Sequence, residues 1–129
     1  MTRLLTALNF LACVAITEAK AQAPYHFNGK ELFELCTSGQ DNAAYLSCAL
    51  FIRGFLAGVL TATGTGEYRD ANSNMSLCLP HGLGAGEAAA AFVQTWRSLE
   101  RTHGDVGPLI NGDADAVLAA LLMKAYPCK

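Results

Sequence analysis

The chain has 129 residues, of which 52% are hydrophobic and 16% are charged, and its formal net charge is −2. Nine basic residues against eleven acidic ones lack the basic excess that is typical of nucleic-acid-binding proteins. The composition also excludes intrinsic disorder, because this much apolar surface can offset the entropy cost of folding. The length fits one compact domain.

The N-terminal segment has the pattern of a secretory signal. Arg3 gives it a positive start, and residues 4–16 form a largely apolar stretch. Small residues follow, and Ala19 and Ala21 form an A-x-A cleavage pattern. We therefore expect residues 1–21 to be removed when the protein is exported.

Two other interpretations of this segment have less support. Residues 4–16 are too few for a membrane-spanning helix, which needs about 20 apolar residues. A lipid anchor on Cys13 is disfavoured because the apolar stretch continues past that cysteine. We expect a periplasmic protein whose single domain covers residues 22–129.

Two helices are predicted in the first half of this domain. The first covers residues 28–36, and turn-forming residues separate it from a second helix over residues 42–62. The second is apolar around nearly its whole circumference, which predicts a central buried helix. A transmembrane helix is the alternative, but Arg53 at its middle would cost about 2.5–3.5 kcal/mol on insertion scales. Gly54 and Gly58 share one face, where another helix is expected to approach closely.

The second half is predicted to start with a long polar loop and to continue with two more helices. Residues 63–76 are rich in glycine, asparagine and charged side chains, and they show no strand pattern. Helical periodicity then covers residues 87–103 and 113–125. The predicted fold is all-α: a small bundle of about four helices with one long polar loop between helices two and three.

Four cysteines remain after the predicted signal: Cys36, Cys48, Cys78 and Cys128. An even number in a small exported domain predicts two disulfides, with three possible pairings. A zinc site is disfavoured because no C-x-x-C occurs. We prefer Cys36 with Cys48 across the first turn, and Cys78 with Cys128, which would join the exit of the loop to the chain end. The sequence does not decide between the pairings.

Candidate catalytic residues are few. His81 is the best-placed histidine, and Glu67 and Asp70 could form a carboxylate pair in the loop, but no nucleophile pattern accompanies them. No phosphate-binding glycine loop, dinucleotide fingerprint or H-E-x-x-H motif occurs. The sequence therefore predicts a protein that is not an enzyme and has no metal or cofactor.

An ordered set of motifs resembles a known family. The pattern is C-x-x-x-x-x-G, then C-x-P-x-G, then a terminal Y-P-C, and here it begins at Cys48, Cys78 and Tyr126. In this order the motifs resemble the Rap/Tai family, the resistance-associated and amidase-immunity proteins linked to type VI secretion. The resemblance covers residues 28–128. It implies a small helical periplasmic protein, often dimeric, that binds and blocks a peptidoglycan-cleaving effector.

The resemblance also implies where the partner binds, because in that family a protruding loop enters the catalytic groove of the effector. In this chain the corresponding loop combines an aromatic anchor with charged neighbours, a mixture typical of recognition sites. The partner-contacting residues are expected to be Glu67, Tyr68, Arg69, Asp70, Asn72 and Asn74.

Two other functions remain open. One is a periplasmic acid-stress chaperone of the HdeA type, which would need many interface carboxylates, whereas this chain has a modest number. The other is a carrier of a small apolar ligand in a pocket beside the second helix.

Overall fold

The computed structural model describes residues 26–71 and 73–129, so the predicted signal segment 1–21 lies outside the described residues. In the described part, the chain forms five helices and two short strands, and it is mainly helical as predicted. The elements are α1 (Gly29–Thr37), α2 (Ala43–Thr63), β1 (Glu67–Arg69), β2 (Ser76–Cys78), α3 (Ala85–His103), α4 (Gly107–Asn111) and α5 (Ala114–Ala125).

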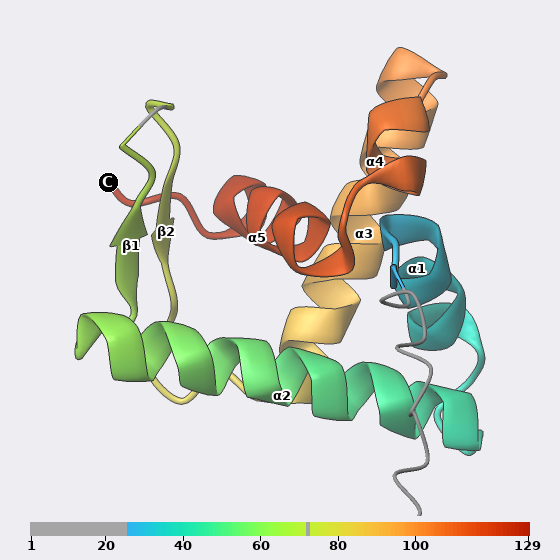
Figure 1. Cartoon of the computed structure of the whole chain (residues 1–129), viewed down its shortest axis with the longest axis horizontal. Coiled ribbons are helices and arrows are strands. Elements are labelled where there is room, and N and C mark those ends of the chain that lie inside the picture. Colours follow the sequence, from blue (N-terminus) through green and yellow to red (C-terminus); the bar gives the residue numbers. More distant parts are fainter. Residues whose placement is uncertain (1–25, 72) are drawn as a thin grey trace, which may run out of the picture.

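The long helix α2 runs along one side of the molecule, and the other elements lie on the same side of it (Figure 1). α1 and α3 pack against α2, and α5 packs against α1, α3 and β2. β1 and β2 form a hairpin at the C-terminal end of α2, at the opposite end of the molecule from α1 (Figure 1).

The core lies where α1, α2, α3 and α5 meet. Trp96 and Phe92 of α3 are its largest buried side chains. Phe33 of α1 stacks on Trp96 with ring centroids 4.8 Å apart, and the Trp96 indole Nε1–H donates a hydrogen bond to Glu100 at 2.9 Å. Burying each large apolar side chain contributes about 1.5–3 kcal/mol, so this cluster is the main source of stability for the helical part.

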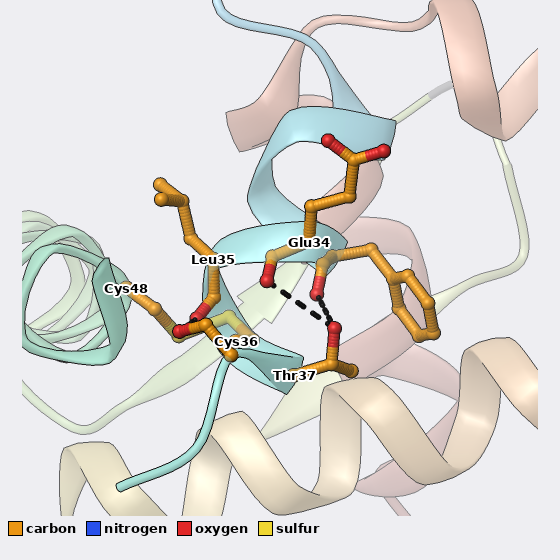
Figure 2. Close-up of a disulfide and its surroundings, with 7 residues drawn as sticks. Glu34, Leu35, Cys36, Thr37 and Cys48 are labelled. Atoms are coloured by element: carbon orange, nitrogen blue, oxygen red, sulfur yellow. Dashed lines mark hydrogen bonds between the residues drawn. A yellow bond between two sulfur atoms is a disulfide. The ribbon is translucent and has the colours of Figure 1, made fainter. Parts of the chain in front are cut away.

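Helix α1 begins and ends with local hydrogen bonds. At its start, the Asn28 side chain accepts from the Glu31 N–H and the Glu31 carboxylate accepts from the Asn28 N–H, both at 3.0 Å. At its end, the Thr37 hydroxyl donates to the Glu34 and Phe33 carbonyls, at 3.2 Å and 2.8 Å (Figure 2).

Both preferred disulfides are confirmed. Cys36 at the end of α1 is bonded to Cys48 in α2, with their Cα atoms 5.1 Å apart (Figure 2). Cys78 at the end of β2 is bonded to Cys128, with a Cα separation of 4.9 Å.

The prediction of a central buried α2 was wrong. Only one face of the helix packs on the fold, whereas Leu46, Leu50 and Leu60 on the outer face are 59%, 57% and 51% exposed. Apolar composition around the whole helix could not show which face would remain uncovered. A Cβ added at Gly54 or Gly58 would meet nothing within 4 Å, so no other described element approaches there, contrary to expectation.

The segment after α2 is also more ordered than predicted. Residues 63–76 were expected to form a loop, but they include β1 and the start of β2. Gly64, at φ 70°, ends α2, because few other residues adopt this left-handed conformation readily. The short helix α4, which three residues separate from the end of α3, was not predicted.

Candidate functional site

The hairpin joins the predicted recognition residues into one structure. Its strands pair antiparallel, with Glu67 opposite Cys78 and Arg69 opposite Ser76. The described residues between the two strands, 70, 71 and 73–75, are here called the tip. The tip is stabilised by a hydrogen bond from the Asp70 N–H to the Met75 carbonyl, at 3.2 Å.

A side-chain hydrogen bond also fixes the tip. The Ser73 hydroxyl donates to the Asp70 carboxylate at 2.6 Å and accepts from the Met75 N–H at 3.4 Å. Such short local bonds are typical of turns in which a polar side chain holds the backbone.

The other end of the hairpin, here called the base, comprises Gly66, Leu77 and Cys78 and is fixed to the fold. The Cys78 N–H donates to the Tyr126 carbonyl at 2.9 Å, next to the disulfide that Cys78 forms with Cys128. Leu77 is only 1% exposed. Gly66 has φ 77°, and a Cβ there would lie 3.2 Å from a methyl carbon of Leu60. The hairpin is therefore held at the base and projects at the tip (Figure 1).

Most of the predicted recognition residues lie on the surface of this hairpin. Glu67, Tyr68 and Arg69 make up β1 and are exposed. Asn74 is exposed at the tip, and Asp70 is half-buried beside it. Asn72 lies outside the described residues.

The tip also exposes an apolar residue that was not among the predicted recognition residues. Met75 is 37% exposed, and Tyr68 is 43% exposed. The available signal was an isolated methionine among asparagines and serines, in a segment that is otherwise polar.

A groove of about 550 Å³ opens between the hairpin, α2 and α5. Leu77 and Met123 lie at its buried side, and Phe55 and Val59 of α2 form another wall. Tyr68 of β1 lines it too. Its volume lies in the range of ligand and side-chain binding sites.

The candidate catalytic residues do not form a catalytic arrangement in the described part of the chain. His81 is exposed in a turn after β2, and among the described residues no hydrogen bond or ion pair joins it to Glu67 or Asp70. No group of three or more potential metal ligands occurs among residues 26–71 and 73–129. One titration is perturbed near the base: burial, with a smaller contribution from the Glu87 carboxylate, raises the pKa of Tyr126 above its ordinary value of 10.0.

α2 is the one helix of the described chain that is long and apolar enough to cross a membrane by length and composition alone. Its disulfide to α1 and the burial of Ile52 and Leu56 against the fold favour a helix of the domain instead. Its uncovered face, here called the outer face of α2, contains Leu46, Leu50 and Leu60, with Arg53 as a charged residue among them.

Comparison with known proteins identifies the family. No curated protein and no solved structure matches this chain. The model of the family described as Rap1a immunity proteins matches residues 28–128. This range includes every helix of the described chain, the hairpin and both disulfides. This agrees with the resemblance seen in the cysteine, glycine and proline motifs. The chain belongs to the Rap1a immunity protein family.

Proposed function

We propose that this protein is exported to the periplasm and that it binds and blocks a type VI effector that cleaves peptidoglycan as an amidase. Membership of an immunity protein family supports a protein that binds an effector and inhibits it without catalysis. Two disulfides support an oxidising compartment, because disulfides persist outside the cytoplasm. The sequence pattern of residues 1–21 supports export by a cleaved signal.

The hairpin is the proposed inhibitory element. The observation that carries the proposal is a narrow projection with a fixed base and exposed recognition side chains at Tyr68 and Arg69. A two-stranded hairpin is thin enough to enter an enzyme cleft, where it would exclude the substrate. The fixed base lowers the entropy cost of binding, since the projection does not have to become ordered in the complex.

Inhibition of an amidase tests the proposal. Amidase effectors of type VI systems, including any encoded near its gene, are each mixed with the exported chain, and peptidoglycan hydrolysis is measured. We expect stoichiometric inhibition. The double variant Tyr68→Ala/Arg69→Ala should raise the inhibition constant about 30-fold, which corresponds to about 2 kcal/mol at a binding hot spot.

The matched control is Arg101→Ala/His103→Ala, two exposed residues at the end of α3. It should inhibit as well as the unmodified chain. Unchanged inhibition by the hairpin variant would contradict the role of the hairpin. No complex at neutral pH, together with binding of unfolded clients only in strong acid, would instead assign the acid-stress chaperone function.

We also propose that the protein is a homodimer through the outer face of α2. Three leucines exposed by half or more lie on this one face, and Gly54 and Gly58 leave room beside it for another helix. Burying such a face against its copy would remove apolar surface from water. Leu46→Glu/Leu50→Glu should turn the dimer into a monomer in light scattering, whereas Ala90→Glu on α3 should not. A monomeric unmodified chain at micromolar concentration would contradict this proposal.

A further inference from the structure

The groove beside the hairpin combines an apolar interior with an acidic rim. Its interior is formed by the side chains of α2, α5 and β2 described above. Asp70 of the tip and Asp115 in the first turn of α5 both line the groove, and no lysine or arginine of the described chain does so. The groove is therefore complementary to a ligand that is apolar along most of its length and positively charged at its end.

The side of the groove that α5 contributes is lined by small side chains, which leaves the groove accessible. Ala116, Ala119 and Ala120 line it at helical spacing, and their methyl groups leave room for a long side chain against the helix. Met123, one turn further along α5, also lines the groove and is only 8% exposed.

The aromatic ring of Tyr68 adds a third complementary feature. It lines the same groove, and its 43% exposure leaves part of the side chain accessible from solvent. A cation that lies over a tyrosine face is attracted by the ring electrons, and arginine stacks on such a face better than lysine because its guanidinium is planar.

We propose that this groove receives an arginine side chain of the protein partner. The methylene stem of the arginine would lie on the apolar interior, and its guanidinium would lie near Tyr68, attracted by the two carboxylates that line the groove, Asp70 and Asp115. The inference rests on the proposed function, because it names a contact that the inhibited partner makes beside the hairpin. It places a second binding element next to the tip: the hairpin enters the partner, and the partner enters the groove.

A peptide titration tests the groove without any effector. The exported chain, purified with both disulfides formed, is labelled with ¹⁵N and titrated with the peptide acetyl-Gly-Arg-Gly-amide. We expect saturable shifts of the backbone amides of Ala116, Ala119 and Met75, with a millimolar dissociation constant. The same peptide with citrulline, which has the shape of arginine without its charge, should bind at least fivefold more weakly.

Three variants sharpen the test. Asp115→Asn should weaken peptide binding about threefold, the effect of losing one exposed charge pair, while Asp105→Asn, an exposed acid away from the groove, should leave it unchanged. Ala116→Trp, at an exposed position, should fill the groove and abolish the shifts while the rest of the spectrum keeps its dispersion.

Equal binding of the citrulline peptide, or shifts that do not involve the groove, would overturn the inference. Amidase inhibition is measured separately. If the peptide does not bind but the amidase is still inhibited, the arginine site is contradicted and the proposed function stands. If the peptide binds but no amidase is inhibited, the proposed function is contradicted and the arginine site stands.

Discussion

At its base, the hairpin is held by a disulfide, a backbone hydrogen bond to Tyr126 and the buried side chain of Leu77. At its tip, by contrast, the hydrogen bonds seen among the described residues are local ones that join Asp70, Ser73 and Met75. The two regions are joined by strands of only three residues each, yet substitutions in them should have different effects on stability. The difference indicates that the base stabilises the fold and orients the tip, while the tip contributes little to stability.

The largest expected effect comes from removing the disulfide at the base. In the chain-entropy model, Cys78→Ser/Cys128→Ser should lower the free energy of unfolding by about 4 kcal/mol, since this bond closes a segment with a separation of 50 residues. The Cys36–Cys48 disulfide closes a separation of only 12 residues, so Cys36→Ser/Cys48→Ser should lower the free energy of unfolding by about 3 kcal/mol. Urea unfolding of both variants measures the difference. An equal or greater loss in the second variant would contradict the chain-entropy explanation.

The next effect separates the base from the tip directly. Leu77→Ala removes a fully buried side chain and should lower the free energy of unfolding by about 3 kcal/mol. Met75→Ala, two residues earlier at the exposed tip, should cost less than about 0.5 kcal/mol. If both variants unfolded at the same urea concentration, the distinction between base and tip would fail.

The sequence predicted four of the five helices of the described chain, and the preferred cysteine pairing was confirmed although the sequence alone left three pairings open. Helical periodicity in residues 87–103 is strong because α3 packs one face on the core. It is weaker in residues 113–125, which are more uniformly apolar, yet α3 and α5 both begin within two residues of the expected positions. The preferred disulfides followed from the order of helices and turns, since Cys36 and Cys48 flank a short turn.

Other features depend on tertiary contacts that a single sequence does not display. β1 is Glu67–Arg69, a charged segment without strand periodicity, and its pairing with β2 is supported by the anchoring of Cys78 to Tyr126 and Cys128. The exposure of α2 was missed for the same reason, because an all-round apolar helix has no polar face to indicate its orientation.

The exposed strand β1 should tolerate substitution without loss of stability. Tyr68→Ala/Arg69→Ala changes exposed side chains of β1, and we expect its free energy of unfolding to stay within about 0.5 kcal/mol of the unmodified chain. Urea unfolding measures this, and it is also the control that the inhibition assay needs. A loss above about 1 kcal/mol would show that these side chains stabilise the fold, and weaker inhibition could then not be assigned to a lost contact.

The smallest effect at the base appears only at high pH. Burial and, to a lesser extent, Glu87 raise the pKa of Tyr126 in the folded chain, whereas in the unfolded chain this residue ionises near its ordinary value of 10.0. The neutral phenol therefore stabilises the fold fully below pH 10, and this contribution is lost as the pH rises through the higher folded-state pKa. Tyr126→Phe keeps the ring and cannot ionise, so above about pH 10 the unmodified chain should lose stability faster than the variant. The other tyrosines and the lysines titrate in both proteins, which is why the difference between their urea-unfolding curves isolates Tyr126. Parallel curves would mean that Tyr126 has the same pKa in both states and that the base is more open to water than its hydrogen bond and disulfide indicate.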